Sequence, residues 1–491
     1  MATRTKRDDP PQTDLGPYRA KRDFDRTPEP SGTGSCRRGT APQRRFVVHE
    51  HHARRLHWDL RLEHDGVLLS WAVPRGIPQL PKPNHLAVHT EDHPLEYLDF
   101  HGEIPSGSYG AGTMTVWDSG TYDLEKLEPD EVIVDLHGRR VQGRYVLFQT
   151  KGDQWMIHRM SPPDDPTREP MPEGVLPMLA TNSTLPADDE HWSFEMKWDG
   201  VRALAAVEGG RVRLTSRRGN DVTERYPELH KLGDALGSTA ALLDGEVVAL
   251  DANGRPSFEL LQPRMHVASP STARRLAART PVVYMLFDVL WIDGHTVMGL
   301  PYTERRERLE ALGLSGPSWQ TPPGHVGDGR AMLETSRELG LEGVVAKRLD
   351  SRYEPGRRSL AWRKVKVSCS QEFVVGGWLP GNGRLESHLG SLLVGYHDET
   401  GALRYAGRVG SGINEAARER IEGRLAAIER DSSPFANPPR LKDAHWVEPA
   451  LVVQVRFHEW TQAGILRHPR YEGLRDDIDP DAVVREPTPG P

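Results

Sequence analysis

A proline-rich stretch one third of the way along the chain constrains what the rest can fold into. Residues 161–177 read SPPDDPTREPMPEGVLP, contain six prolines and show no hydrophobic periodicity. Because proline lacks a backbone donor and fixes φ, such a stretch forms neither a regular helix nor a central strand. The 491-residue chain is therefore predicted to fold as separate units on either side of a linker at residues 161–176.

The N-terminal unit is predicted to be mostly β. Apolar and polar residues alternate over residues 56–63, Asp65-Gly66 follows, and residues 67–73 are apolar, which is the pattern of a hairpin. Further short strands are expected at residues 112–117, 132–136, 144–149 and 154–158. We expect residues 1–160 to form a small β-barrel or sandwich. Residues 1–45 have a net charge of +5 and several prolines and glycines, and this arm is expected to be largely extended.

Strands and helices alternate beyond the linker, which predicts an α+β domain over residues 177–367. Its expected strands include residues 242–250 and 282–292, and its expected helices include residues 303–312 and 329–339. The last section, residues 368–491, is predicted to be a C-terminal OB-fold β-barrel with a short tail. Its expected elements are strands at 372–378 and 451–457, a hairpin at Thr400-Gly401 and a helix at 414–430.

Composition excludes several classes of protein. The two cysteines, Cys36 and Cys369, exclude a disulfide scaffold and a Cys-ligated zinc ribbon. Eighteen consecutive apolar residues occur nowhere, so we expect a soluble, cytoplasmic protein with no membrane partner. The net charge of −7 argues against a uniformly basic nucleic-acid binder but not against local basic surfaces.

Lysine is scarce and histidine is clustered. Only 11 of the 63 basic residues are lysine, so a lysine is more often than usual present for its chemistry. Nine of the 21 histidines lie within residues 49–101, which points to metal or phosphate chemistry there.

The segment Glu195-Met196-Lys197-Trp198-Asp199-Gly200-Val201-Arg202 places a lysine between two carboxylates. If the segment is a strand, Glu195, Lys197 and Asp199 share one face. A salt-bridged structural lysine is the alternative explanation, because short motifs recur by chance. The same domain also contains Asp244-Gly245-Glu246 at the expected end of a strand, Phe287-Asp288 within another, residues 342–347 (EGVVAK) and residues 362–366 (WRKVK).

This ordered set closely resembles the nucleotidyltransferase motifs of ATP-dependent DNA ligases over residues 177–366. The resemblance implies that Lys197 attacks the α-phosphate of ATP and becomes adenylated. It implies that Glu246 and Glu342 bind Mg²⁺, that Phe287 lies against the adenine face, and that Arg202 and Arg217 contact ribose or nicked-strand phosphate. Lys364 and Lys366 would lower the pKa of Lys197 and stabilise charge on the phosphates. The implied cofactor-binding residues are Glu195, Arg202, Arg217, Glu246, Phe287, Glu342, Lys364 and Lys366.

The third domain resembles the family's OB fold, which is expected to clamp DNA and complete the ATP site. Residues 467–471 (RHPRY) and 474–477 (LRDD) are similar to the family's C-terminal motif. Relatives commonly carry a lysine soon after the last arginine, whereas this chain has Ile478. Arg467, Arg470 or Arg475 would then have to orient the pyrophosphate.

His51-x5-His57-x-Asp59 places two imidazoles and a carboxylate within nine residues. His57 and Asp59 share a strand face, and His51 would fold back from the preceding turn. This donor set suits Mn²⁺ or Zn²⁺. An exposed histidine- and arginine-rich face that binds nucleic acid or is merely solvated is the alternative.

The surrounding residues 15–160 resemble the 3′-phosphoesterase domain of bacterial DNA ligase D proteins. The segments that carry this resemblance are residues 18–24 (YRAKRDF), 27–30 (TPEP), 53–57 (ARRLH), 70–74 (SWAVP), 91–97 (EDHPLEY) and 109–113 (YGAGT). The resemblance implies that His51, His57 and Asp59 bind Mn²⁺ and that Arg61, His93 and Tyr97 act on the scissile phosphate. It also implies supporting roles for Arg22, Asp23 and Glu29, so the arm is expected to be ordered over the site.

Together these resemblances imply an enzyme that restores a 3′-OH and then seals nicks or ends of double-stranded DNA in bacterial non-homologous end joining, with Ku as partner. No stretch of the chain is left for a polymerase domain, so a repair polymerase is expected on a separate polypeptide. The expected location is the cytoplasm, at the nucleoid. The alternatives are an RNA ligase or a GTP-using capping enzyme with an inactive DNA-binding first domain, or an end-bridging scaffold.

Overall fold

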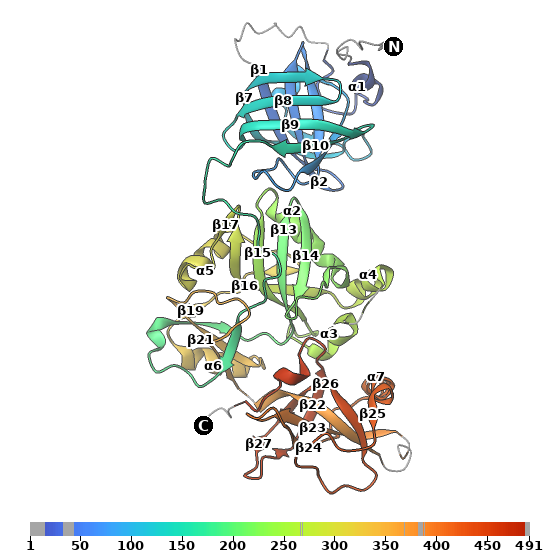
Figure 1. Cartoon of the computed structure of the whole chain (residues 1–491), viewed down its shortest axis with the longest axis vertical. Helices are drawn as coiled ribbons and strands as arrows, with labels where there is room; N and C mark the ends of the chain where they lie inside the picture. Colours follow the sequence, from blue (N-terminus) through green and yellow to red (C-terminus); the bar gives the residue numbers. More distant parts are fainter. Residues whose placement is uncertain are drawn as a thin grey trace, which may run out of the picture.

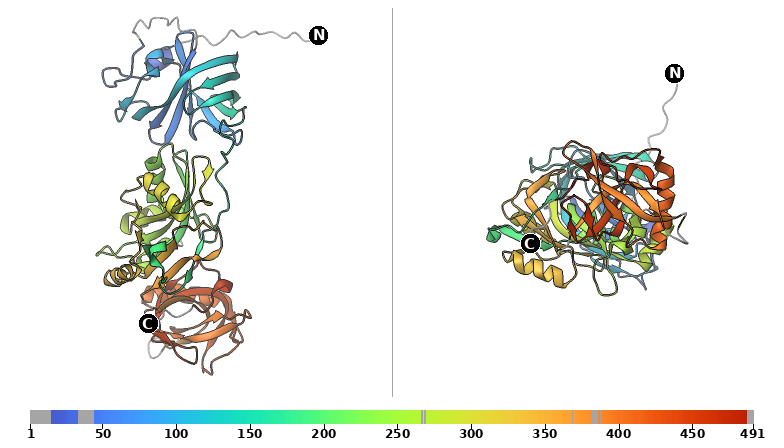
Figure 2. Two further views of the ribbon diagram at one scale, coloured as in Figure 1. Left: turned by 90° about the vertical axis from the view of Figure 1, so that its left-hand side faces the viewer. Right: turned by 90° about the horizontal axis from the view of Figure 1, so that it is seen from below.

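The computed structural model describes residues 15–32 and 44–486, apart from 266, 268, 368, 382–385 and 387. Three modules follow one another along the long axis of the molecule, with a barrel at one end, an α+β module in the middle and a second β module at the other end (Figure 1, Figure 2). Most of the predicted extended arm, residues 1–14 and 33–43, lies outside the described residues, as does Cys36.

The first module is a closed β-barrel. Its elements are α1 (Gly16–Ala20), β1 (Arg44–His52), β2 (Leu56–His64), β3 (Val67–Val73), β4 (His85–His89), β5 (His93–Pro94), β6 (Gly102–Ile104), β7 (Gly112–Glu128), β8 (Glu131–His137), β9 (Gln142–Lys151) and β10 (Gln154–Arg159). The strands pair in the order β1-β2-β3-β4-β10-β9-β8-β7, and β7 pairs back with β1. Closure leaves none of these eight strands with an open edge.

The β2–β3 hairpin forms where the residue alternation predicted it. Asp65 and Gly66 both have positive φ, 46° and 89°, as a two-residue hairpin turn requires. The even-numbered apolar residues of β2, among them Leu60 and Leu62, face the barrel core with Trp71 of β3. The odd-numbered residues of β2 therefore lie on the outer face of the barrel.

The middle module contains two antiparallel-rich sheets and several helices. Its elements are β11 (Leu179–Asn182), β12 (Trp192–Met196), β13 (Val201–Glu208), β14 (Arg211–Ser216), α2 (Leu232–Leu236), β15 (Ala241–Ala249), α3 (Phe258–Met265), α4 (Pro270–Arg279), β16 (Val282–Ile292), β17 (His295–Thr296), α5 (Tyr302–Ala311), β18 (Trp319–Gln320), β19 (His325–Val326), α6 (Gly329–Glu338), β20 (Gly343–Arg348) and β21 (Arg358–Lys366). One sheet has the order β14-β13-β15-β16-β17, with β18 beside β16. The other has the order β11-β21-β20-β12-β19.

Two local predictions for this module are wrong. Strand β12 ends at Met196, so Glu195, Lys197 and Asp199 do not share one strand face. The chain leaves the strand because it must cross between the two sheets at Gly200, where a Cβ atom would lie 2.3 Å from the carbonyl oxygen of Val247. Strand β15 also continues past Asp244-Gly245-Glu246 to Ala249, because these residues pair with both β13 and β16.

The third module is an antiparallel sheet with one helix. Its elements are β22 (Cys369–Pro380), β23 (Leu389–His397), β24 (Leu403–Val409), α7 (Glu415–Leu425), β25 (Glu429–Arg430), β26 (His445–Phe457), β27 (Glu459–Trp460), β28 (Leu466–Arg467) and β29 (Arg470–Leu474). The sheet order is β24-β23-β22-β26-β25, with β29 on β26. The helix predicted at 414–430 stops at Leu425, because Glu429 and Arg430 pair with β26 instead. The predicted fold class, a small β-barrel, an α+β domain and a C-terminal OB-fold barrel, is confirmed.

The proline-rich segment is docked on the middle module rather than separate from it. Asp165 is 2.7 Å from His295 of β17, and the backbone N–H of Glu169 donates to the carbonyl of Gly294 at 2.7 Å. Its carboxylate accepts from the N–H of Thr296 at 3.0 Å. The prolines of this segment have no backbone N–H, so few of its N–H groups need a hydrogen-bond partner when it packs on the middle module.

None of the helices in the described part of the chain combines the length and the apolar character that a membrane crossing requires.

Candidate functional site

The β1–β2 hairpin brings three potential metal ligands together. His51 lies directly across from His57 in the hairpin register, and Asp59 lies across from His49. The ligand atoms of His51, His57 and Asp59 all lie within 4.8 Å of one another. Nε2 of His51 is buried without a hydrogen-bond partner among the described residues. Two imidazoles and one carboxylate with an unused nitrogen fit a borderline divalent cation.

Arg61 lies beside this triad and is already hydrogen-bonded at both ends of its fork. One terminal nitrogen donates to Asp59 at 3.0 Å and the other to Ser70 at 3.1 Å, while the guanidinium stacks 4.7 Å from the ring centre of Tyr97. Burial alone would raise the pKa of Asp59, but Arg61, His51 and His57 hold it well below its usual value. Asp59 is therefore ionised whether or not a cation is bound.

The described part of the N-terminal arm packs against Glu91, His93 and Tyr97. Arg22 donates to Glu29 at 2.7 Å and to Glu91 at 2.9 Å, and it lies 3.3 Å from Nε2 of His93. The Tyr97 hydroxyl donates to Glu29. Burial, reinforced by Arg61 and Arg22, keeps the pKa of His93 well below its usual value, so this ring is neutral near pH 7. With Nδ1 donating to the Glu91 carbonyl at 2.8 Å, Nε2 of His93 is an acceptor.

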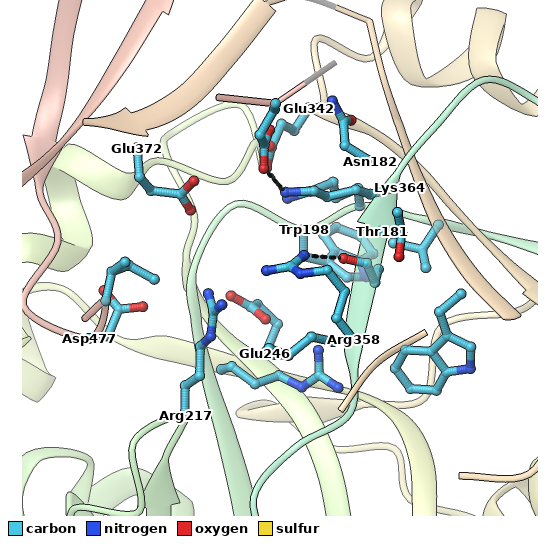
Figure 3. Close-up of a pocket in the computed structure, with 18 of the residues that line it drawn as sticks. Thr181, Asn182, Trp198, Arg217, Glu246, Glu342, Arg358, Lys364, Glu372 and Asp477 are labelled. Atoms are coloured by element: carbon cyan, nitrogen blue, oxygen red, sulfur yellow. Dashed lines mark hydrogen bonds and ion pairs between the residues drawn. The ribbon is translucent and has the colours of Figure 1, made fainter. Parts of the chain in front are cut away.

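A cavity of about 620 Å³ lies between the middle and third modules. Its size suits a nucleotide-sized ligand. The structure brings all nine residues predicted for the nucleotide site into its lining: Glu195, Lys197, Arg202, Arg217, Glu246, Phe287, Glu342, Lys364 and Lys366. Figure 3 shows Glu246, Glu342 and Lys364 turned toward the same space, with Arg217, Glu372 and Asp477 on the other side of it.

The lysines of this cavity are paired with carboxylates. Lys197 donates to Glu342, whose other oxygen is 3.3 Å from Lys366. Burial would raise the pKa of Glu342, but Lys197 and Lys366 lower it to about 2. Glu486 pairs with Lys364 and lies 3.4 Å from Lys366. Each lysine therefore faces a negative charge before any phosphate arrives.

The opposite end of the cavity is aromatic. Arg202 and Lys347 each lie 4.5 Å from the ring centre of Phe287, and Lys347 is 4.4 Å from the ring centre of Trp362. The Arg202 fork is engaged by Asp244 through two hydrogen bonds of 2.6 Å. Asp244 therefore fixes the orientation of the Arg202 guanidinium.

Glu246 has no ion-pair partner among the described residues, unlike Glu342. Burial raises its pKa to about 7, although Arg202 and Lys197 oppose this. A buried carboxyl of this kind gains most from a cation that binds next to it.

Only one of the three arginines proposed for the C-terminal motif reaches the cavity. Arg475 lines it and is held by Asp477 at 2.8 and 2.9 Å. Arg467 is bonded to Glu459, and the exposed Arg470 lies outside the lining as well. Ile478 is buried against the apolar cluster of the third module and also borders the cavity.

Several lining residues have no role assigned by the sequence motifs. Glu372, Trp362, Arg358 and Glu486 all border the cavity. Trp362 begins the WRKVK motif and Arg358 lies on the same strand, β21, so the position of Lys364 on that strand is a signal for both. Glu486 had no such signal, because 122 residues separate it from its partner Lys364.

Comparison with known proteins gives a consistent result. Residues 49–149 match the family described as the DNA ligase D 3′-phosphoesterase domain, residues 177–366 match the ATP-dependent DNA ligase domain, and residues 386–478 match the ATP-dependent DNA ligase C-terminal region. Across 477 residues, 96% of this chain, it is 46% identical to the multifunctional non-homologous end joining DNA repair protein LigD of Mycobacterium tuberculosis. The chain belongs to the DNA ligase D family.

Other members are also similar. The non-homologous end joining protein LigD of Pseudomonas aeruginosa is 37% identical over 540 residues, which cover 98% of this chain and 63% of that protein. A solved structure of mycobacterial DNA ligase D complexed with ATP and MES is 42% identical, covers 64% of this chain and 98% of that one, and has a TM-score of 0.49. The chain spans about 61% of the length of the mycobacterial LigD proteins that it matches.

Proposed function

We propose that this chain is an ATP-dependent DNA ligase that seals 3′-OH/5′-phosphate breaks through a lysyl-AMP intermediate, and that its first module heals 3′ ends. The observation that carries the proposal is the single cavity that gathers all nine predicted nucleotide-site residues around Lys197. Within this proposal the working units are 1–160, 177–367 and 368–491, joined by residues 161–176.

The proposed adenylation begins with Lys197. Its amine must lose a proton before its Nζ lone pair can attack the α-phosphate of ATP, forming an N–P bond while the bond to pyrophosphate breaks. Lys364 and Lys366 would stabilise the charge on the phosphates, and Phe287 would support the base. Glu246 and Glu342 would hold Mg²⁺, which supplies positive charge to the triphosphate.

Sealing follows in two further steps, each of which is a nucleophilic attack on phosphorus. The 5′-phosphate of the break attacks Lys197–AMP and takes over the AMP, and the 3′-OH then attacks that phosphate and releases AMP. Arg202 and Arg217 would orient the ribose or the nicked-strand phosphate. Arg475 would orient the pyrophosphate that departs in the earlier adenylation step. Glu195 is the remaining proposed contact to the nucleotide.

In the first module we propose that His51, His57 and Asp59 hold Mn²⁺. Such an ion supplies Lewis-acid polarisation of a terminal 3′-phosphate. Arg61 would bind the phosphate by giving up one of its present partners, and Tyr97, fixed by Glu29, would border it. Because Nε2 of His93 is an acceptor, we propose that His93 orients Arg22 or a water molecule until it gains a proton.

The names of the bacterial relatives support a place in non-homologous end joining. We therefore propose Ku and a repair polymerase as partners. We also propose that the protein acts in the cytoplasm, at the nucleoid, because these relatives are named for DNA repair.

The central test is incubation with α-labelled ATP and Mg²⁺, followed by denaturing electrophoresis. A labelled 55 kDa band that disappears in Lys197→Ala is the expected result. Labelling by GTP in preference to ATP, or sealing of nicked RNA but not nicked DNA, would favour a capping enzyme or an RNA ligase. A Lys197→Ala protein that still seals nicks contradicts the ligase proposal.

The first module is tested separately with a primer-template that ends in a 3′-phosphate. Phosphate release that requires Mn²⁺ and His57 is expected. Binding of this DNA without any release would instead indicate an inactive DNA-binding module.

A further inference from the structure

The two carboxylate oxygens of Glu195 have different surroundings. The Tyr302 hydroxyl donates to Oε1 at 2.6 Å, and Nζ of Lys347 lies 2.9 Å from the same atom. Arg306 is also nearest to Oε1, at 3.9 Å. Within the described parts of the chain, no hydrogen bond reaches Oε2. Glu195 lines the cavity, as Lys347 does, and Oε2 is the oxygen that these contacts leave for a ligand.

Glu195 lies at the aromatic end of the cavity. Lys347 connects the two, since its Nζ donates to the Phe287 carbonyl at 3.0 Å and lies 4.5 Å from the Phe287 ring centre. The phosphate-binding cations Lys364 and Lys366 are paired instead with Glu342 and Glu486. On the proposed function, the base of the nucleotide therefore lies beside Glu195 and its phosphates lie beside the lysines.

A carboxylate accepts hydrogen bonds and donates none, so the number of oxygens that it offers limits which base it binds. Guanine presents two adjacent donors, its ring N–H and its 2-amino group, and satisfies both oxygens of a carboxylate at once. Adenine presents one exocyclic amine beside a ring nitrogen that only accepts. A carboxylate with one free oxygen therefore suits adenine, and the guanine carbonyl oxygen next to it is repelled.

We propose that Tyr302 and Lys347 are positioning residues that occupy Oε1 of Glu195, so that only Oε2 is available to the base and the site selects ATP over GTP. This inference rests on the proposed adenylation activity and adds its base selectivity. Neither residue needs to touch the nucleotide, because each acts by hydrogen bonding to Oε1 of Glu195 and so keeps that oxygen from the base.

The surroundings fit such a fixed arrangement. Tyr302 and Lys347 are 2% and 1% exposed, so neither donor is free to turn away into solvent. Burial raises the pKa of the Tyr302 phenol well above its usual value, which keeps the hydroxyl proton in place to be donated. Tyr302 is the first residue of α5 and Lys347 belongs to β20, so two separate elements hold the same atom.

The experiment measures formation of the labelled enzyme–nucleotide adduct with ATP, GTP and ITP in the full chain. Tyr302→Phe removes one donor and keeps the ring. We expect KM for ATP to rise several-fold with kcat nearly unchanged, and the ratio of kcat/KM for ATP to that for GTP to fall about tenfold, as for loss of a hydrogen bond to a charged group. Lys347→Met removes the other donor, and the ratio is expected to fall further.

Tyr353→Phe is the matched control. Tyr353 is 3% exposed and its hydroxyl also donates to a carboxylate, Asp244, at 2.6 Å, but neither residue borders the cavity. Its ATP:GTP ratio is expected to equal that of the wild type. Equal ratios for Tyr302→Phe and Tyr353→Phe, with adduct still forming on ATP, would overturn the inference and leave the ligase proposal intact. Absence of any adduct in the wild type would instead overturn the ligase proposal.

A measurement on the unmodified protein covers the case in which the buried variants do not fold. Purine riboside triphosphate lacks the amine of ATP, while 2,6-diaminopurine riboside triphosphate keeps it and adds the 2-amino group of guanine. We expect the first to raise KM about tenfold or more at similar kcat, and the second to behave like ATP. The reverse order of the two analogues would overturn the inference.

Discussion

The metal triad and the nucleotide cavity are built in opposite ways. The triad comes from one hairpin, within nine residues, and its geometry follows from strand register alone. The cavity is lined by residues from Leu176 to Glu486, and two modules must meet to form it. The ligands of the triad are in place as soon as the hairpin forms with its strand register. The cavity, in contrast, depends on how the middle and third modules pack against each other. Changes at one site are therefore expected to leave the other intact.

The largest expected effect separates the two sites at Lys197. Lys197→Arg keeps a positive charge opposite Glu342, but a guanidinium does not become a free nucleophile near neutral pH. We expect adduct formation to fall at least about 1,000-fold, as for loss of other covalent nucleophiles. Release of 3′-phosphate, measured in the same preparation, should be unchanged. Parallel loss of both activities would show that the two sites are coupled.

His57→Ala is the reciprocal change. Removing one of three ligands should lower Mn²⁺-dependent phosphate release about 100-fold or more, while adduct formation stays at the wild-type rate. Chelation by EDTA before the phosphate-release assay should lower release by the wild type to a similar extent, and added Mn²⁺ should reverse that loss. His101→Ala is the control, since His101 is exposed and outside the triad.

A smaller effect is expected at Glu486. Glu486→Gln removes the negative charge from Lys364 and Lys366, so ATP no longer has to displace it. We expect KM for ATP to fall about fivefold with little change in kcat, because a larger fraction of the protein is ready to bind. Glu419→Gln, an exposed carboxylate on α7, should leave KM unchanged. A higher KM in Glu486→Gln would mean that Glu486 supports nucleotide binding instead.

The smallest effect concerns pH and distinguishes the barrel from the cavity. His85 is buried in the barrel, its Nδ1 lies 2.7 Å from the Gly76 carbonyl, and burial lowers its pKa. The unfolded chain therefore binds a proton near pH 6.5 that the folded barrel does not bind, and stability falls as pH drops through that value. We expect His85 to account for up to about 1 kcal/mol of the stability lost between pH 7 and 5.5 in urea unfolding, so this loss is smaller in His85→Gln. A pH profile identical in both proteins would exclude His85 as the source.

Patterns with short-range causes could be predicted from the sequence. The bounds of β3 and β16 match the predicted apolar runs, because strand alternation and turn residues act over a few positions. The triad was found for the same reason. The ligase motifs located the nine cavity residues, but not Glu486 and Tyr302, which bond to Lys364 and Glu195.

What the sequence could not predict depends on contacts between distant segments. Lys197 was placed on a strand face, although the sheet crossing at Gly200 ends the strand before it. The proline-rich segment was expected to be a linker, yet its contacts with His295 and Gly294 arise only in the folded middle module. Pairing of Glu486 with Lys364 likewise has no local signature, because ordinary acidic residues near a chain end give no indication of their partner.

The pairing of every cavity lysine has a consequence for which anions can enter. A bare phosphate, such as one on the backbone of intact DNA, would have to separate Lys364 and Lys366 from Glu486 and leave this half-buried carboxylate without a counter-charge. On the proposed function, a triphosphate that arrives with a divalent cation would bring both signs of charge. Its phosphates would then replace the carboxylates as partners of the lysines, and the carboxylates would be free to bind the cation. The pocket without ligand is therefore expected to admit a nucleotide together with its divalent cation more readily than an anion alone.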